Sequence, residues 1–139
     1  MEDTTKPDKP TIIVPFALSP VHAGFPSPAD DYMERDLDLN ALLIRHKDAT
    51  FYVRVAGDSM EGVGIFEGDV LVIDKAEIPA HNTVVIAMIN GEFTVKRLYQ
   101  KGSEVYLVPA NPKYRAIRIT EAMQFQVWGV VTYCIHRMK

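Results

Sequence analysis

Short runs rich in Val, Ile, Thr and aromatic residues follow one another between positions 51 and 134, and they constrain the fold more than any other feature. Gly, Pro or Asn punctuates these runs, as is typical of β-strands joined by turns. Many short strands with little helical periodicity favour a sandwich or folded sheet over alternating β-α units. We therefore predict a mostly β domain with strands at Phe51–Val55, Val70–Asp74, Thr83–Ile89, Glu92–Tyr99, Glu104–Val108 and Gln126–Cys134.

Turn and cap residues predict two further elements. Asn90-Gly91 separates two of the runs, and this pair favours the two-residue turn of a hairpin. The segment Asp36–His46 is the best helix candidate. Asp38 or Asn40 would cap it, because their side chains accept hydrogen bonds from the free N–H groups of a first turn. We expect this helix to be short.

The N-terminal residues differ in character from the rest of the chain. Prolines recur so often that no helix of about eight residues fits between them (Pro7, Pro10, Pro15 and Pro20). Ile12–Val14 and Phe16–Leu18 therefore indicate an extended apolar segment that can lie along a surface or join a sheet edge. Gly24–Pro28 follows as an irregular linker. We predict an N-terminal arm and linker over residues 1–28 and one compact domain over residues 29–139.

Composition narrows the class of protein. The chain has 139 residues, of which 47% are hydrophobic, and this is enough for one domain with a buried core. Its net charge is −3, so we expect no direct binding of nucleic acid, which would need a basic surface. Cys134 is the only cysteine, which excludes an intrachain disulfide and a zinc site built from cysteines.

The N-terminus carries no basic stretch, and the apolar run from Ile12 to Leu18 is short and interrupted by Pro15. We therefore expect neither a signal peptide nor a membrane span. Because a single cysteine suits a reducing compartment, we expect the protein in the cytoplasm.

No metal or cofactor site is predicted. The histidines are scattered and are expected at the surface (His22, His46, His81 and His136). No cluster of His, Cys, Asp or Glu has the spacing of metal ligands in the sequence. The glycines near the middle of the chain match neither a Walker nor a Rossmann fingerprint, so we interpret them as turns (Gly57, Gly62, Gly64 and Gly68).

Lys96 is a candidate general base. Side chains alternate between the two faces of a strand, so Lys96 shares a face with Thr94 and Leu98 in the run Glu92–Tyr99. Packing of that face against the core would favour the neutral amine, which can accept a proton from a hydroxyl. From this segment alone, an ordinary solvated lysine on an edge strand is the alternative.

Ser59 is a candidate nucleophile. It lies in the run Gly57-Asp58-Ser59-Met60, directly after a predicted strand, where a tight turn would expose its hydroxyl. Successive backbone N–H groups of such a turn can point to one place and hold an oxyanion. Gly, Asp and Ser also favour ordinary turns, so plain turn chemistry is the alternative from these residues alone.

Five motifs in a fixed order resemble those of a known family: Ala23–Ala29, Gly57–Met60, Gly68–Val72, Gly91–Leu98 and Trp128–Val131. From about Phe16 to Val131 the chain resembles the UmuD/MucA proteins. These are accessory subunits of error-prone translesion DNA polymerases, and they belong to the same peptidase family as LexA and related phage repressors. The resemblance implies the mostly β, LexA-like peptidase fold, in agreement with the strands predicted above.

The resemblance further implies a serine protease that cuts its own chain. Ser59 would be the nucleophile and Lys96 the general base of a Ser-Lys dyad. The backbone N–H groups of Asp58 and Ser59 would bind the oxyanion. The bond cut would be Ala23-Gly24, where the best-known UmuD has Cys-Gly, so the residue before the cut is small in both. No cofactor is implied.

Partners are implied by the resemblance as well. A RecA filament on single-stranded DNA would activate self-cleavage during the SOS response to DNA damage. The trimmed chain would form a homodimer and serve a UmuC-type translesion polymerase in SOS mutagenesis. The residues of this sequence do not themselves indicate a surface that contacts RecA.

Two rival functions are considered beside this one. In a non-catalytic polymerase adaptor, the Ser-Lys pair would be idle. A fragment of a LexA-like repressor would need a pair of DNA-reading helices ahead of the cleavage site, and 23 residues interrupted by prolines cannot form one.

Overall fold

The computed structural model describes residues 13–17 and 33–138, with side chains described from Leu37 onward. These residues fall into two compact units, divided between Ile44 and Arg45. The predicted cleavage bond Ala23-Gly24 lies outside the described residues, as does the predicted boundary between the arm and the domain. The two units are described one at a time.

The first unit contains a two-stranded antiparallel sheet followed by one helical turn. Strand β1 (Ile13–Ala17) pairs with β2 (Met33–Asp38), so the apolar segment predicted to be extended does form a strand. Helix α1 covers Leu39–Leu43, and the Asp38 side chain caps it by accepting from the N–H groups of Asn40 and Ala41. The short helix and its Asp38 cap are confirmed. It begins later than Asp36, because β2 runs to Asp38.

The second unit contains a seven-stranded antiparallel sheet with the strand order β3-β4-β9-β5-β6-β7-β8. A short 3-10 turn, η2 (Lys47–Ala49), directly precedes β3, and a second one, η3 (Glu61–Val63), follows the loop after β3. The strands are β3 (Thr50–Arg54), β4 (Val70–Asp74), β5 (Val84–Ile89), β6 (Glu92–Lys101), β7 (Glu104–Val108), β8 (Ile117–Arg118) and β9 (Phe125–Ile135).

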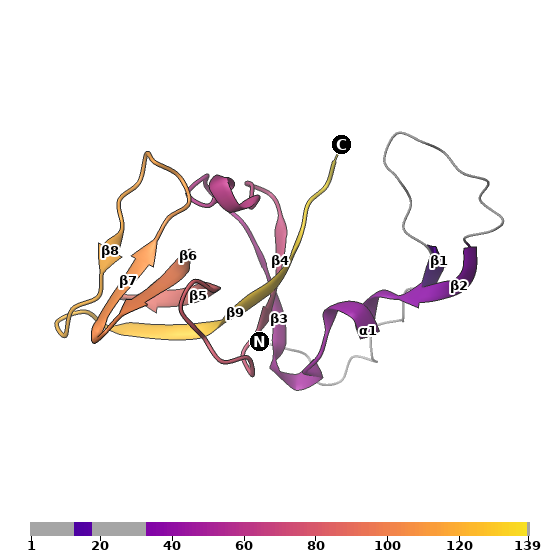
Figure 1. Ribbon diagram of the computed structural model, residues 1–139, viewed down its shortest axis with the longest axis horizontal. Helices are drawn as coiled ribbons and strands as arrows, with labels where there is room; N and C mark the ends of the chain where they lie inside the picture. Colours follow the sequence, from indigo (N-terminus) through magenta and orange to yellow (C-terminus); the bar gives the residue numbers. More distant parts are fainter. Residues whose placement is uncertain (1–12, 18–32, 139) are drawn as a thin grey trace. The chain divides into compact units, whose positions relative to one another are not determined.

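The last strand, β9, joins the two halves of this sheet. Its first part pairs with β5 and its second part with β4, as the long yellow strand in Figure 1 shows. The register shifts once in each pairing, which leaves Trp128 and Thr132 as extra residues of β9. Such bulges bend a strand, and here they let one strand serve both halves. At Gly129 a Cβ would lie 2.6 Å from Ile73 Cγ2, so only glycine fits at this crossing.

Two hydrophobic clusters stabilise the folded sheet. The first cluster lies around the β4 side of the sheet, and its buried members are Met60, Ile65, Leu71, Ile73 and Ile86. The second lies toward β7, and its buried members are Val85, Ala87, Leu98, Leu107 and Val130. Consecutive residues of β5, Val85 and Ile86, fall in different clusters because their side chains point to opposite faces. The sheet therefore has apolar packing on both faces around β5.

The mostly β fold predicted from the sequence is confirmed. Each predicted strand is present, with ends shifted by at most two residues. Asn90 and Gly91 adopt positive φ values of 49° and 86°, as the predicted hairpin turn requires. Strands β2 and β8 were not predicted. Over the described ranges, no helix is both long and apolar enough to cross a membrane.

Candidate active site

Lys96 is positioned by the hydrogen-bond ladder of the sheet. It lies in the middle of β6, opposite Val85 of β5. Leu98, two residues further along the same face, is only 2% exposed. The side chain of Lys96 is accordingly half-buried, as the alternation of the strand predicted, and is not a solvated edge residue.

Three oxygen atoms surround the Lys96 amine. Its Nζ lies 2.9 Å from Ser59 Oγ, 2.7 Å from Thr94 Oγ1 and 3.0 Å from the Val95 carbonyl oxygen. A neutral amine has two N–H donors and one lone pair. It can therefore donate to the Val95 carbonyl and to Thr94, and accept from the Ser59 hydroxyl. This arrangement gives the amine a complete set of partners when it is uncharged.

The surroundings of Lys96 favour this uncharged form. Burial lowers the pKa of the Lys96 amine below its ordinary value, because a charged group is poorly solvated there. No carboxylate in the described part of the chain forms an ion pair with Lys96 to offset this effect. At neutral pH, a larger fraction of molecules therefore has an uncharged Lys96 amine that can accept a proton.

Ser59 is positioned by a turn and not by a strand. It follows β3 and directly precedes Met60, which is 3% exposed and belongs to the first hydrophobic cluster. Gly57 opens the turn with a φ of 84°, a value that few other residues adopt, and its N–H donates to Glu67 at 3.1 Å. The buried Met60 side chain holds the turn against the sheet, while Ser59 itself is half-buried.

Ser59 and Lys96 line a cavity of about 250 Å³. Its other lining residues include both apolar and polar ones from β3, β5, β6 and the turn that carries Ser59: Val53, Arg54, Val55, Met60, Ile86, Phe93, Thr94 and Val95. The cavity therefore offers apolar contacts to a segment with small side chains, beside the polar groups of Ser59, Thr94 and Lys96.

The structure thus brings together Ser59 and Lys96, which lie 37 residues apart in the sequence. Asp58, whose backbone N–H was predicted as an oxyanion donor together with that of Ser59, lies in the same turn. Ala23 and Gly24 lie outside the described residues. Thr94 was not predicted as a site residue, although its position two residues before Lys96 on one face of a strand was a usable signal.

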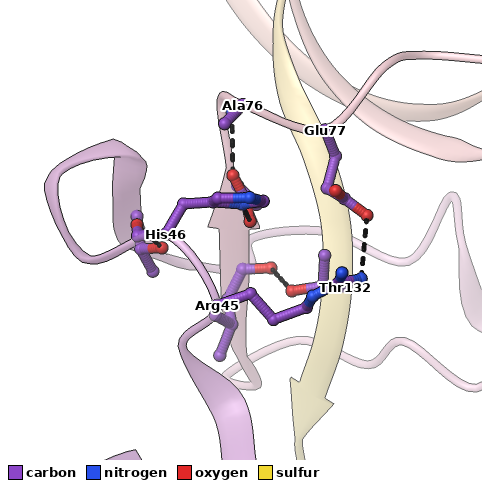
Figure 2. A network of polar contacts seen from close by, with 8 residues as sticks. Arg45, His46, Ala76, Glu77 and Thr132 are labelled. Carbon is purple, nitrogen blue, oxygen red and sulfur yellow. Dashed lines mark hydrogen bonds and ion pairs between the residues drawn. The ribbon is translucent and has the colours of Figure 1, made fainter. Parts of the chain in front are cut away.

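Among the histidines that the structure describes, none contacts the Lys96 amine, but His46 belongs to a polar cluster that the sequence did not predict. Atoms of His46, Asp74 and Glu77 that could bind a metal lie within 4.8 Å of one another, although their sequence spacing did not indicate a site. Figure 2 shows this network. His46 Nδ1 lies 2.6 Å from Asp74, which also accepts from the Ala76 N–H at 2.8 Å, and Arg45 lies 3.8 Å from Glu77. Because these groups already have protein partners, we assign no metal to the cluster.

A second histidine, His136, pairs with Asp69, the residue directly before β4, whereas His46 pairs with Asp74 at the end of that strand. His136 Nδ1 lies 2.5 Å from Asp69, which is 2% exposed and also accepts from the Phe66 N–H at 2.8 Å. The hydrogen bond from the Phe66 N–H lowers the pKa of Asp69 most, and the contact with His136 lowers it further. Together they outweigh burial, which raises the pKa, so the pKa lies below its ordinary value. His46 and His136 lie at the surface, as expected, with side chains 40% and 44% exposed, but each also pairs with a buried carboxylate, a contact that the sequence did not predict.

Comparisons with known proteins show which family and which relatives the chain resembles. The family model described as Peptidase S24-like matches residues 15–132. Protein SamA of Salmonella typhimurium is 51% identical over 117 residues, which cover 84% of this chain and 81% of SamA. Protein ImpA of Escherichia coli is 44% identical over 126 residues, or 90% of this chain and 85% of ImpA. Protein MucA of Escherichia coli is 41% identical over 123 residues, or 88% of this chain and 84% of MucA. The predicted resemblance to MucA-type proteins is confirmed.

Proposed function

Because this chain belongs to the Peptidase S24-like family, we propose that it is a serine peptidase that cuts its own chain at Ala23-Gly24. The observation that carries the proposal is the 2.9 Å contact between Ser59 Oγ and a half-buried lysine amine. A hydroxyl in contact with a base of lowered pKa is the arrangement that activates a serine nucleophile.

The first step transfers one proton and forms one bond. Lys96, in its neutral form, takes the proton of the Ser59 hydroxyl as Oγ attacks the carbonyl carbon of Ala23. The carbonyl oxygen becomes an oxyanion, and the backbone N–H groups of Asp58 and Ser59 are the proposed donors to it. The protonated Lys96 then gives its proton to the Gly24 nitrogen as the Ala23-Gly24 bond breaks.

The second step returns the enzyme to its starting state. A water molecule attacks the carbonyl carbon of the ester between Ala23 and Ser59, and Lys96 accepts a proton from that water. Lys96 then gives this proton to Ser59 Oγ as the ester bond breaks, which restores the hydroxyl and the neutral amine. The products are a peptide ending at Ala23 and a chain beginning at Gly24. Thr94 and the Val95 carbonyl would hold the amine in place while its protonation state changes, since both contact Nζ.

The proposed substrate is joined to its own catalytic site. Tethering replaces a bimolecular encounter with an intramolecular one, which favours attack by several kcal/mol in well-oriented cases. The rate of cutting would then depend on how often the N-terminal segment is docked while Lys96 is neutral. A partner that binds the docked form more tightly would raise the rate without supplying any catalytic group.

The proposed biological role follows the MucA-type relatives. The activating partner would be a RecA filament on single-stranded DNA, and the setting would be the SOS response in the cytoplasm. The trimmed product would act as a homodimer and as accessory subunit of a UmuC-type translesion polymerase. Support for this role is the 41–51% identity to SamA, ImpA and MucA over most of the chain. Every strand of the second unit lies after the cut, so the product should keep its fold.

Self-cleavage of the pure protein tests the proposal. The chain is incubated at alkaline pH without any partner, and the products are identified by mass and by N-terminal sequencing. A fragment that begins at Gly24 in the wild type, and its absence in Ser59→Ala, is the expected result. If the wild type remains whole even with an activating filament, the protein is a non-catalytic adaptor. A cut at another bond, or cutting by Ser59→Ala, would contradict the assigned site.

A further inference from the structure

The loop that follows β7 holds the turn that carries Ser59. Asn111 Nδ2 donates to the carbonyl oxygen of Asp58 at 2.8 Å. The Ala110 N–H donates to the carbonyl oxygen of Ser59, also at 2.8 Å, and the Gly62 N–H donates back to the Ala110 carbonyl at 2.6 Å. Two segments about 50 residues apart in sequence are thus joined by three hydrogen bonds at the nucleophile.

These bonds fix both peptide planes that flank Ser59. A peptide unit is planar and trans, so its N–H points opposite to its C=O. Asn111 holds the Asp58 carbonyl, and this fixes the direction of the Ser59 N–H, one of the two proposed oxyanion donors. Ala110 holds the Ser59 carbonyl in the same way and fixes the next peptide plane. The Glu61 N–H also donates to the Asp58 carbonyl, at 3.3 Å, so the orientation of the turn is set by this local bond together with the two shorter bonds from the Asn111 loop.

The Asn111 amide is itself oriented by its own loop. Its Oδ1 accepts from the Lys113 N–H at 3.0 Å, and its backbone carbonyl accepts from the Tyr114 N–H at 3.1 Å. Pro109 and Pro112 lie on either side of this residue and each fixes its own φ. With Oδ1 engaged, Nδ2 is the part of the amide that faces Asp58. The donor is thus positioned before the N-terminal segment docks.

The Asp58 side chain makes a second connection to the same loop. The Tyr114 hydroxyl donates to its carboxylate, and Lys113 Nζ lies 3.5 Å from it. The Tyr114 hydrogen bond is the main reason that the pKa of Asp58 lies below its ordinary value. At Gly62 a Cβ would overlap the Ala110 carbonyl oxygen, so the two segments pack with no space between their backbones.

We propose that Asn111 is a positioning residue for self-cleavage, holding the Asp58–Ser59 peptide so that the Ser59 N–H faces the oxyanion, with Tyr114 supporting it through the Asp58 carboxylate. This inference deepens the proposed function and rests on it. Asn111 does not contact the Lys96 amine, so it acts on the oxyanion donor and the nucleophile and leaves the base unchanged.

Self-cleavage rates of Asn111 variants across a range of pH test this role. Asn111→Asp keeps an oxygen for the Lys113 N–H but removes the donor to Asp58, and Asn111→Ala removes both. Loss of one oxyanion-hole donor slows an enzyme by about 10²–10³-fold, and a misaligned donor should cost part of that. We expect the alkaline plateau of the rate to fall by about 10–100-fold in both variants, with the midpoint of the pH profile unchanged.

A second readout does not depend on docking of the N-terminal segment. A fluorophosphonate labels an activated serine by forming an Oγ–P bond while fluoride leaves. Its rate of reaction with Ser59 should fall along with the self-cleavage plateau. Tyr114→Phe removes one hydroxyl from an exposed side chain, and we expect a fall of about 3–10-fold, because it acts on the donor indirectly. Tyr106→Phe is the matched control, since Tyr106 donates to Glu104 at 3.0 Å in an equivalent surface pair.

The outcomes separate this inference from the proposed function. A wild-type plateau and wild-type labelling in both Asn111 variants would overturn the positioning role while self-cleavage stands. The role is also overturned if the rate falls only in proportion to the unfolded fraction measured by thermal melting. Failure of the wild type to cut under any condition would instead defeat the proposed function itself.

Discussion

Ser59 and Lys96 reach the same point in space by different means. Lys96 is placed by the ladder between β5 and β6, whose register runs without a break from the Val84–Arg97 pair to the Ile89–Glu92 pair. Ser59 is placed by an irregular turn held by a buried methionine and by the Asn111 loop. One position is set by periodic local structure and the other by contacts distant in sequence.

This difference shows where the site is robust and where it is sensitive. Many hydrogen bonds of the ladder together fix the backbone position of a strand residue. One substitution on β6 therefore leaves the backbone of Lys96 in place. A turn position depends on a few specific bonds, so one substitution can shift the Ser59 hydroxyl by a fraction of an ångström or more. Substitutions at Lys96 should therefore change chemistry alone, and substitutions near Ser59 should change geometry.

The largest effect is expected at Lys96. General-base catalysis contributes about 10²–10⁴-fold, so Lys96→Ala should reduce self-cleavage by at least that factor. Lys96→Arg should not restore it, because a guanidinium stays protonated and cannot accept the proton. Circular dichroism should show both variants folded, since the ladder holds β6. A Lys96→Arg chain that cuts at a rate near the wild type would remove the lysine base from the mechanism.

Gly62→Ala should give the next largest effect, because it shifts the turn without touching a reacting group. The added Cβ would overlap the Ala110 carbonyl oxygen, so the turn and the loop must move apart. A displacement of about 1 Å can cost about 10²-fold in rate, and we expect a loss of that order. Gly102→Ala is the control for general strain, since Gly102 has a φ of 62° and open space around it. Equal rates for these two variants would show that the turn is not geometry-sensitive.

Thr94→Val should have a moderate effect and should shift the pH profile. The threonine oxygen accepts from the amine and so stabilises the protonated form of Lys96. Its removal should lower the lysine pKa further, which moves the midpoint of the pH–rate profile to lower pH, with a plateau reduced by roughly 10-fold or less. Thr132→Val, which removes a hydroxyl bonded to the Val72 carbonyl, is the matched control. A midpoint shift to higher pH would contradict the assigned contact.

The smallest effect on cutting is expected at His46, which lies in the polar network of Figure 2. Burial raises the pKa of Asp74, but hydrogen bonds from His46 and Ala76 outweigh it and hold the pKa below the ordinary value. At pH values above the ordinary carboxyl pKa, Asp74 therefore contributes its full stabilisation. This stabilisation is lost as the pH falls through the lowered pKa that Asp74 has in the folded chain. His46→Ala should reduce the free energy of unfolding at neutral pH by about 1 kcal/mol.

The same variant should cut at the wild-type rate, because His46 does not contact Ser59 or Lys96. Denaturant unfolding at several pH values would measure the stability change, which should shrink toward acid pH. His81→Ala is the control, since His81 accepts from the Gln100 N–H at an exposed site and pairs with no buried carboxylate in the described ranges. A larger stability loss at acid pH than at neutral pH would contradict the Asp74 assignment.

Periodic features of this molecule could be predicted from its sequence, and features set by long-range contact could not. The strands, the Asn90-Gly91 turn and the inward face of Lys96 follow from local preference and alternation. Strand β8 was missed because two residues, Ile117 and Arg118, carry no pattern. The partner strand β2 was missed because pairing with β1 depends on residues about 20 positions away.

The candidate site shows the same limit. Its two central residues were found through resemblance to a family, since alternation placed Lys96 on an inward face but could not show that Ser59 lay beside it. Asn111 lies 53 residues from Asp58, and the run around it reads as an ordinary proline-rich turn. Only the folded chain shows that this turn contacts the one that carries Ser59.

The rate of self-cleavage as a function of pH tests the central claim, that Lys96 accepts the Ser59 proton in its neutral form. The full chain is incubated without a partner, and appearance of the fragment that begins at Gly24 is followed over time. Since burial lowers the pKa of Lys96, the rate should rise with pH and level off below the ordinary lysine value. A rate that does not change with pH, or a bell-shaped profile centred near pH 6.5 as a histidine base would give, would contradict the account.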